Sequence, residues 1–260
     1  MSAVGRQREI VEMVMTKGEI KIQDISERFG VSDMTARRDL NELDRRGLLR
    51  RVHGGAVANL GRSYEPSFQT RITKKAKEKE AIGKKAAELI YDGDSIALDV
   101  GTTTLEVARN LAGVRNLTVL TNSIQISNVL VETLTLETEA RLILTGGIVR
   151  PRELSMVGSI SEEVYQNFHV DKVFLGIGGI DIENGLTEYN MEDAKIKQVM
   201  LKNAQTKIVV ADSSKLDATT FQEVAPLSAI DTIITDWNIS EEAMRKYGEQ
   251  DIDILLAEEL

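Results

Sequence analysis

Cysteine is absent from the 260-residue chain, and histidine occurs only twice. Without cysteine the protein has no disulfide and no thiolate metal ligand, and two histidines are too few for a histidine-rich metal site. We therefore expect no metal and no other cofactor. A chain without disulfides suits a reducing compartment, so we expect it in the cytoplasm.

Long hydrophobic runs are also missing. No stretch of about 18 consecutive apolar residues, the length of a membrane-spanning helix, occurs, and the N-terminus lacks the apolar core of a signal peptide. We expect neither membrane insertion nor export. With only 3 prolines, 42% hydrophobic and 28% charged residues, the composition is typical of a well-folded globular protein.

An excess of positive charge is also missing, because 32 Lys and Arg stand against 41 Asp and Glu, a formal net charge of −9. The charge is unevenly distributed, however. Residues 1–79 contain 17 Lys and Arg against 11 Asp and Glu, a net of +6, which leaves −15 for residues 80–260. A basic head on an acidic body is what a nucleic-acid binder with a separate sensor requires, and the chain length favours two domains.

Three helices are predicted within the first fifty residues. Apolar side chains recur at helical spacing in residues 6–16 and 22–29, and Gly30 stands where a helix is expected to end. Ser32 can cap a third helix, over 33–46, by accepting a bond from its first-turn amides. The apolar side of that helix consists of Ala36, Leu40 and Leu43.

The opposite side of the third helix has the chemistry of a DNA-reading surface. Two short helices joined by a tight turn form a helix-turn-helix, whose second helix enters the major groove. Arginine can bond guanine edges, asparagine can read adenine, and threonine can bind phosphates. A solvated helix face would explain any one of these residues, but together they predict a DNA-binding set: Ser32, Met34, Thr35, Arg37, Arg38, Asn41 and Arg45.

A basic wing is predicted directly after this helix. Residues 48–57 have the pattern of two short strands, and their arginines, Arg50 and Arg51, are placed to hold the sugar-phosphate backbone. The segments V-S-D-M-T-A-R-R-D-L (31–40) and G-L-L-R-R-V-H-G-G-A (47–56) resemble the signature of the DeoR family.

The resemblance implies roles for individual residues. Thr35, Arg37 and Arg38 match the family's DNA-facing positions, and Arg51 and His53 match its wing. Asp39 lies at the edge of the apolar side, so we predict that it is a structural partner of a nearby arginine rather than a reader of bases.

The rest of the chain predicts a different architecture. We expect a DNA-binding domain over 1–58, a linker over 59–73 and an α/β domain over 74–260. Apolar runs alternate with helical stretches, which predicts a mainly parallel, doubly wound sheet. The runs are 95–100, 117–121, 141–145, 172–177, 207–211, 232–235 and 252–256.

Small, polar or glycine-rich turns follow five of these runs. Ligands of open α/β sheets bind beyond the carboxyl ends of the strands, where a helix start favours a phosphate. One G-T-T-T turn is more often a helix cap than a site, but five such turns favour a ligand site. The predicted effector-binding residues are Asp99, Gly101, Thr102, Thr103, Thr104, Thr121, Asn122, Gly146, Gly147, Glu192 and Lys215.

These turns also resemble the DeoR sensor domain, over about Lys77 to Asp236. That domain shares its fold with ribose-5-phosphate isomerase, which implies a phosphorylated sugar or sugar acid as effector. We therefore expect a repressor of a carbohydrate-utilisation operon that binds double-stranded operator DNA as a homodimer or homotetramer and is released by this effector.

Two alternatives stay open. The second domain could isomerise a sugar phosphate, with Glu192 as base and Lys215 holding the substrate, although the glycine-rich, lysine-containing segment of the isomerase is replaced here by residues 186–191. Because of that difference we expect a sensor without catalytic residues. A second domain that only oligomerises, on an architectural DNA-binding protein, is the other alternative.

Overall fold

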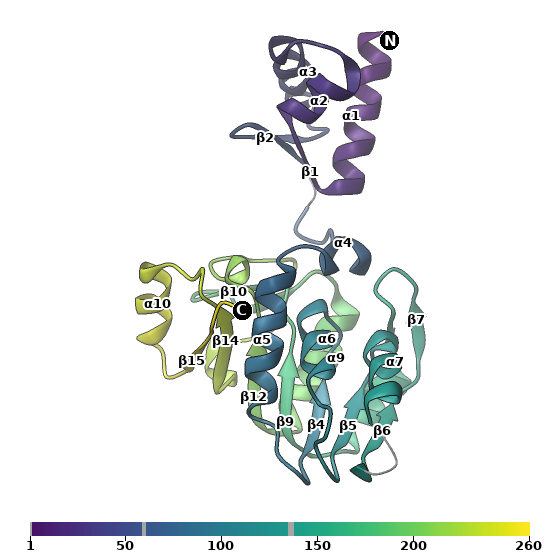
Figure 1. The fold of residues 1–260 in the computed structure, drawn as a ribbon, viewed down its shortest axis with the longest axis vertical. Helices are drawn as coiled ribbons and strands as arrows, with labels where there is room; N and C mark the ends of the chain where they lie inside the picture. Colours follow the sequence, from purple (N-terminus) through teal and green to yellow (C-terminus); the bar gives the residue numbers. More distant parts are fainter. Residues whose placement is uncertain (1, 59–60, 135–137) are drawn as a thin grey trace. The chain divides into compact units, whose positions relative to one another are not determined.

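The computed structural model describes residues 2–58, 61–134 and 138–260. The chain divides into two compact units, Met1–Pro66 and Ser67–Leu260, which are described separately (Figure 1). Across the described ranges, none of the helices combines the length and apolar character that a membrane crossing requires.

The first unit contains three helices and a small antiparallel sheet. The helices are α1 (Ala3–Lys17), α2 (Ile22–Phe29) and α3 (Asp33–Arg45), and the strands pair in the order β1-β3-β2. The strand bounds are Glu19–Lys21 for β1, Arg50–Val52 for β2 and Gly55–Val57 for β3. The predicted helices and the two wing strands are thus confirmed, whereas β1 was not predicted.

Local sequence explains the limits of these helices. Ser32 caps α3 by accepting the backbone N–H of Thr35, as predicted. Gly30 ends α2 in the left-handed conformation, with φ +61°, which glycine adopts without strain. The core of the unit gathers one side of each helix and includes Ile10, Ile25, Ala36, Leu40 and Leu43, all at most 1% exposed.

A seven-stranded, entirely parallel sheet forms the centre of the second unit. Its strand order is β15-β14-β12-β9-β4-β5-β6. The strands coincide with the seven apolar runs of the sequence, so the predicted parallel α/β sheet is confirmed. Their bounds are β4 (Ser95–Leu98), β5 (Thr118–Thr121), β6 (Arg141–Leu144), β9 (Val170–Leu175), β12 (Ala204–Val210), β14 (Thr232–Asp236) and β15 (Asp253–Ala257).

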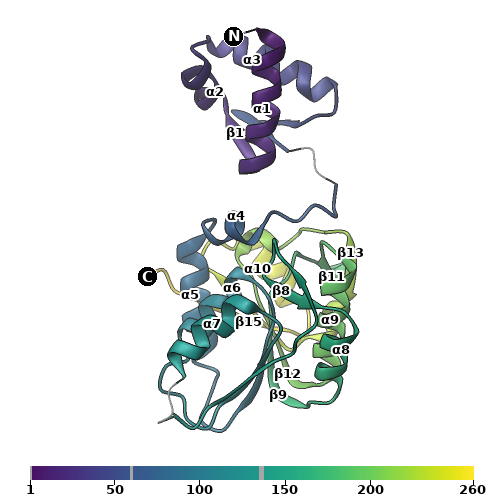
Figure 2. The same ribbon diagram turned by 90° about the vertical axis from the view of Figure 1, so that its right-hand side faces the viewer.

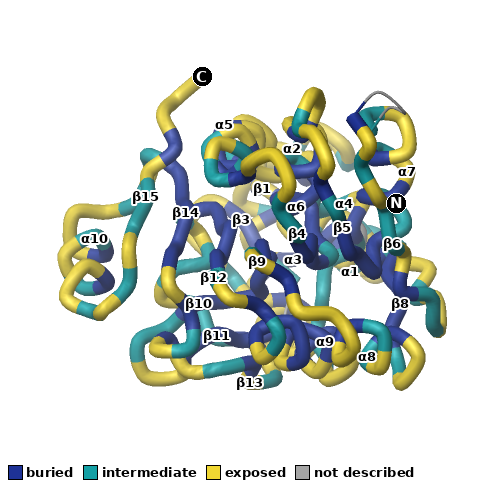
Figure 3. The backbone as a smooth tube through the Cα atoms, turned by 90° about the horizontal axis from the view of Figure 1, so that it is seen from below, coloured by how far each residue is buried: buried dark blue, intermediate teal, exposed yellow. Residues whose placement is uncertain are grey.

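Both faces of this sheet are covered, as Figures 2 and 3 show. One face carries α5 (Ala76–Ala87), α6 (Thr102–Arg109) and α7 (Ile124–Thr133). The other carries α8 (Ser159–Gln166), α9 (Met191–Lys202) and a small antiparallel sheet in the order β10-β11-β13. A separate hydrophobic cluster fills the space on each face.

The shorter elements complete the second unit. The small sheet consists of β10 (Gly179–Asp181), β11 (Gly185–Glu188) and β13 (Gln222–Ala225), and a hairpin joins β7 (Ile148–Arg150) to β8 (Ser155–Val157). The remaining helices are α4 (Phe68–Ile72), α10 (Glu241–Gly248) and two 3-10 turns, η2 (Ser213–Lys215) and η3 (Leu227–Ala229).

The predicted linker, 59–73, includes structured residues. Residues 59–60 lie outside the described part of the chain, but α4 falls inside the predicted range. Phe68, only 1% exposed, belongs to the cluster under α5 and α6. A helix of five residues is too short to display a periodic pattern, so the sequence shows no signal for it. The three predicted domain ranges remain predictions.

Candidate functional site

The predicted DNA-reading side of α3 points away from the core of the first unit. Arg37 and Arg38 are exposed and Met34 is 79% exposed, whereas Ala36 and Leu40 on the other side are fully buried. The N-terminal cap residue, Ser32, is also exposed. The arginines are therefore accessible to a nucleotide, which their predicted role requires.

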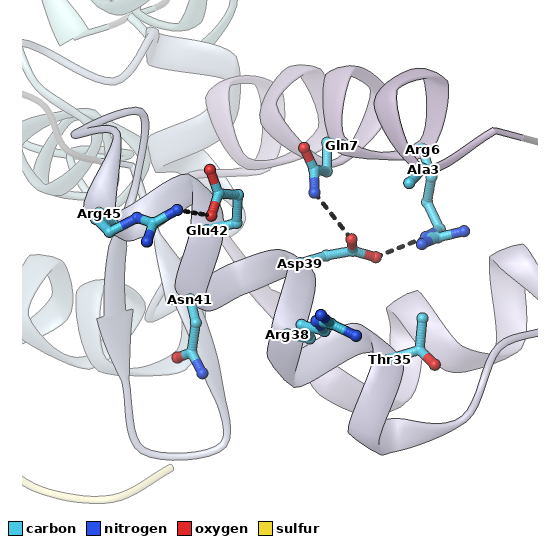
Figure 4. A pocket seen from close by; sticks show the side chains of 9 residues that line it. All are labelled: Ala3, Arg6, Gln7, Thr35, Arg38, Asp39, Asn41, Glu42 and Arg45. Atoms are coloured by element: carbon cyan, nitrogen blue, oxygen red, sulfur yellow. Dashed lines mark hydrogen bonds and ion pairs between the residues drawn. The ribbon is translucent and has the colours of Figure 1, made fainter.

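A groove separates the N-terminal half of α1 from α3 (Figure 4). At its base, Arg6 Nε and Gln7 Nε2 of α1 donate to Asp39 Oδ2 and Oδ1 of α3, at 2.6 and 3.0 Å. Asp39 is 4% exposed and both of its oxygens are engaged. The prediction that it serves as a structural partner of a nearby arginine is confirmed. The groove is lined by Ala3, Arg6, Gln7, Thr35, Arg38, Asp39, Asn41, Glu42 and Arg45.

The wing is joined to α3 through two of the predicted DNA-binding residues. Arg51 Nη1 donates to Asn41 Oδ1 at 2.6 Å, and the backbone N–H of Arg51 donates to Asp44 Oδ1 at 2.9 Å. Reading adenine requires both the oxygen and the amino group of an asparagine. In this arrangement the Asn41 oxygen already accepts one bond from Arg51, and a contact to adenine would use its second lone pair and its amino group.

The other predicted wing and helix residues lie at the surface. Arg50 and His53 are exposed, and Gly54 at the tip of the hairpin has φ +83°. Arg45 forms an ion pair with Glu42 one turn earlier in α3. The structure thus places the ten predicted residues on α3, its cap and the β2–β3 hairpin, and their DNA contacts remain predictions.

In the second unit, the turns after β4, β5, β6, β9 and β12 meet at one edge of the sheet, because all these strands are parallel. Gly101 is the N-cap of α6, whose first turn is Thr102, Thr103 and Thr104. Thr104 Oγ1 donates to Gly101 O at 3.1 Å. The amides of this first turn have the orientation of a phosphate cradle.

Several of the predicted effector residues also have structural contacts. Asn122 Nδ2 donates to Met156 O at 2.9 Å, and Asn122 Oδ1 accepts from the Tyr165 hydroxyl at 3.2 Å. Gly147 has φ +120°, and a Cβ there would lie 2.6 Å from Val157 O. Packing thus accounts for the residue types at these two positions, and their predicted effector contacts stay predictions.

A buried ionic cluster at the same edge was not predicted. Lys197 of α9 forms an ion pair with Asp99 and lies 3.4 Å from a Glu188 carboxylate oxygen. It also donates to Gly176 O at 3.0 Å. The side chains of Lys197 and Asp99 are each 3% exposed, and that of Glu188 is 7% exposed. Because a lysine within a helix is ordinarily solvated, the sequence offered little indication that Lys197 is buried.

Burial and charge act against each other in this cluster. Burial raises the pKa of the Asp99 carboxyl to about 6, although Lys197 lowers it. Burial lowers the pKa of the Lys197 ammonium, but attraction to Asp99, Glu188 and Asp193 outweighs this effect and leaves it above the ordinary value. Lys197 therefore stays charged and holds the carboxylates together.

Glu192 and Asp193 are neighbours in the first turn of α9 with different surroundings. Glu192 is exposed, whereas Asp193 is buried and forms an ion pair with Arg150 of β7. Lys215, in η2, lies with its ammonium 5.7 Å from the centre of the Tyr189 ring. Asp193 and Arg150, rather than Glu192, thus join the charged groups at this edge.

Comparisons with known proteins agree with this two-part organisation. Residues 6–60 match the family described as the DeoR-like helix-turn-helix domain, and residues 74–237 match the DeoR C terminal sensor domain. The chain is 32% identical over 256 residues to a putative aga operon transcriptional repressor of Escherichia coli O157:H7, covering 98% of this chain and 94% of that protein. It is 33% identical over 236 residues to the glycerol-3-phosphate regulon repressor of Escherichia coli K12, covering 91% and 92%.

One solved structure to which part of the chain shows a likeness is ribose 5-phosphate isomerase A from Methanocaldococcus jannaschii. It has a TM-score of 0.40 and 18% identity, and the likeness covers 55% of each chain. The two family matches cover the helix-turn-helix and the sensor domain, and the relatives align over nearly their whole length. The chain therefore belongs to the DeoR family of helix-turn-helix transcriptional regulators.

Proposed function

We propose that this DeoR-family protein represses a carbohydrate-utilisation operon and leaves its operator when it binds a phosphorylated sugar or sugar acid. The observation that carries the proposal is the exposed side of α3, which presents Arg37 and Arg38 and is bonded through Asn41 to Arg51 of the basic wing. The relatives named as repressors of the aga operon and of the glycerol-3-phosphate regulon support the operon class.

The DNA contacts divide between bases and backbone. Arg38 lines the groove beside α1 and is exposed, so its guanidinium can reach a guanine edge in the major groove. Arg50 and His53 on the hairpin are positioned for phosphates. We propose a homodimer or homotetramer, because two heads on a repeated operator double these contacts.

The effector site lies at the carboxyl edge of the parallel sheet. The backbone amides of the first turn of α6 and the hydroxyls of Thr102 and Thr103 would bind the phosphate at the positive end of the helix, while the Thr104 hydroxyl is bonded to Gly101 O. Lys215 supplies a cation on η2, the turn that follows β12 at the same edge of the sheet. The effector must bind the DNA-free arrangement more tightly than the operator-bound one, and the coupling is reciprocal.

We assign no catalytic step to the sensor domain, and we place the protein in the cytoplasm with its DNA. The candidate isomerase base, Glu192, is exposed on the first turn of α9 rather than enclosed with the buried charged groups. Incubation with ribose 5-phosphate followed by detection of ribulose 5-phosphate tests this assignment. Isomerised product would overturn it.

The proposed function is tested by two linked measurements on the full chain. Selection of genomic DNA fragments by the purified protein should enrich a repeated or palindromic operator. A gel shift on that operator is then repeated with glycerol 3-phosphate, ribose 5-phosphate, fructose 1-phosphate, glucose 6-phosphate and 6-phosphogluconate. Release by at least one of these compounds is expected, whereas failure to enrich any DNA would refute the proposal.

A further inference from the structure

We propose that Arg150 is the ligand-responsive residue of the effector site, and that the turn after it transmits ligand occupancy to α4. This inference rests on the proposed function, since it assumes that the effector binds at the carboxyl edge of the sheet. It assigns Arg150, Glu153 and Arg71 roles that the sequence did not indicate.

The first step is the incomplete coordination of Asp193. Its Oδ2 forms the ion pair with Arg150 and accepts from Asn190 Nδ2 at 2.7 Å. Its Oδ1 is buried and has no hydrogen-bond partner among the described residues. A buried acceptor without a donor is unfavourable, so a ligand hydroxyl at this position would be stabilised. An anionic group on the same ligand would compete with Asp193 for Arg150.

The pair is close to the other charged groups of the site. Asp193 is 7% exposed and acts electrostatically on both Asp99 and Lys197. Arg150 keeps 22% of its side-chain surface exposed, so a ligand can reach it. Arg150 thus stands between the buried cluster and solvent, where a bound sugar derivative would change its partner.

The second step is the compact turn that follows Arg150. The backbone oxygen of Arg150 accepts from Leu154 N at 2.8 Å and from Glu153 N at 3.2 Å. Leu154 adopts a left-handed conformation with φ +55°, and its own oxygen accepts from Ile124 N at 2.9 Å. These bonds make 150–154 a small hydrogen-bonded unit, so a shift of Arg150 displaces its other members.

The third step joins this turn to α4. Glu153 forms an ion pair with Arg71 of α4, with 4% and 19% of the two side chains exposed. Phe68 N at the start of α4 donates to Arg152 O at 3.2 Å. The turn therefore holds α4 at two points, and α4 begins two residues after the last residue of the first unit, Pro66.

The C-terminal side of α4 is held independently. Lys79 of α5 donates from Nζ to Arg71 O and to Lys74 O, both at 2.6 Å. The backbone of Arg71 is thus tied to α5, which packs on the sheet, while its side chain and the beginning of α4 are tied to the turn. Movement of the turn would tilt α4 about its attachment to Lys79, and the chain leading to the DNA-binding unit would follow.

The test uses the full chain, its selected operator and whichever of the five gel-shift compounds releases the wild type. Glu153→Gln breaks the ion pair to Arg71 with little change in shape, and Arg71→Met breaks it from the other side. Lys172→Met is the matched control. Lys172 forms an ion pair with Asp94 at the amino end of the sheet, and its side chain is 17% exposed, close to the 19% of Arg71.

We expect Glu153→Gln and Arg71→Met to bind the operator and the sugar phosphate as the wild type does, but to lose the coupling between them. Allosteric coupling commonly changes affinity by about 5- to 150-fold, and we expect less than about twofold in these variants. Wild-type coupling in both variants would overturn the inference and leave the proposed function intact. Absence of any release in the wild type would count against the proposed function instead.

A ligand-free measurement tests the same inference independently. Asp193→Asn removes the charged partner of Arg150 at the site, and hydrogen exchange is then followed in α4 by mass spectrometry. We expect exchange of the α4 amides to rise by about threefold or more, since local protection reflects the contacts that hold a segment. No change in α4, or an equal change in Lys172→Met, would overturn the inference.

Discussion

Arg6 Nε donates to Asp39 Oδ2 at 2.6 Å, and this ion pair joins α1 to α3 in the first unit. The two side chains are 11% and 6% exposed. Three consecutive positions in the signature segment thus divide into two roles, because Arg37 and Arg38 face outward while Asp39 joins the helix to α1. The direction in which the arginines point depends on this inward contact.

Asp39→Ala should destabilise the first unit. Removal of one partner from a buried ion pair leaves the other charge uncompensated, and we expect a loss of about 3 kcal/mol in the free energy of unfolding. Urea denaturation of the full chain measures it. Arg8→Ala is the control, since Arg8 and Glu12 form an exposed pair whose loss should cost less than about 0.5 kcal/mol. Equal losses in the free energy of unfolding for Asp39→Ala and Arg8→Ala would show that the Arg6–Asp39 pair stabilises the unit no more than an exposed pair does.

Arg38→Ala should weaken operator binding without affecting stability. A bidentate contact to a base contributes about 1 to 3 kcal/mol, which corresponds to about a 5- to 150-fold loss of affinity. Fluorescence anisotropy at one salt concentration checks this, because phosphate contacts vary with salt. Arg245→Ala removes the same charge from an exposed position of α10 and should bind the operator normally.

Lys215→Ala should separate the two functions of the chain. The ammonium lies in the second unit on η2, so operator affinity in the absence of effector should be retained. Release by the effective sugar phosphate should be lost, because the anion loses its cationic partner. The gel shift with the same compounds measures both. Loss of operator binding by a folded Lys215→Ala protein would contradict the proposed position of the effector site.

Lys197→Met should be among the most destabilising substitutions in the second unit. It leaves the Asp99 and Glu188 carboxylates buried without their cation, and we expect a loss of about 3 to 5 kcal/mol. Lys195→Met, on the same helix but exposed, should change stability by less than about 0.5 kcal/mol. Denaturant unfolding measures both variants. Equal free energies of unfolding for Lys197→Met and Lys195→Met would show that the buried ionic cluster does not stabilise the second unit.

Lys79 should make stability depend on pH above neutrality. Burial lowers the pKa of its ammonium to about 8 from 10.5. Between these values the unfolded chain binds a proton that the folded chain does not, so this residue makes the free energy of unfolding rise with pH. Lys79→Met lacks this titration. From pH 8.5 to 9.5, the wild type should gain up to about 1 kcal/mol relative to Lys79→Met, and a relative loss would contradict the assignment.

The strands of the main sheet were predictable because each is a run of mainly apolar residues, although the two edge strands, β6 and β15, are partly exposed. Such a run is recognisable without knowledge of its partners. The small sheet was not predictable in the same way. Its strands have only three or four residues, and β10 (Gly179–Asp181) pairs with β11, which pairs in turn with β13.

The candidate effector site also combines residues that the sequence indicated with residues that it did not. Gly101 and the threonines after it were identified from their position between a strand and a helix, which is a local property. Lys197 was overlooked, because a lysine in a helix is ordinarily solvated. Arg150 and Asp193 were overlooked because a hairpin and a helix 43 residues apart in the chain bring them together.

The sequence by itself determined where the helices of the first unit and the seven strands of the main sheet form, which side of α3 is polar, and the family to which the chain's motifs correspond. These are properties of neighbouring residues and their periodicity. Only the tertiary structure decided which charged groups are buried and with whom they pair. Lys197 and Asp99 are 98 residues apart, and their contact arises because α9 packs on the sheet beside the carboxyl end of β4, where packing excludes water.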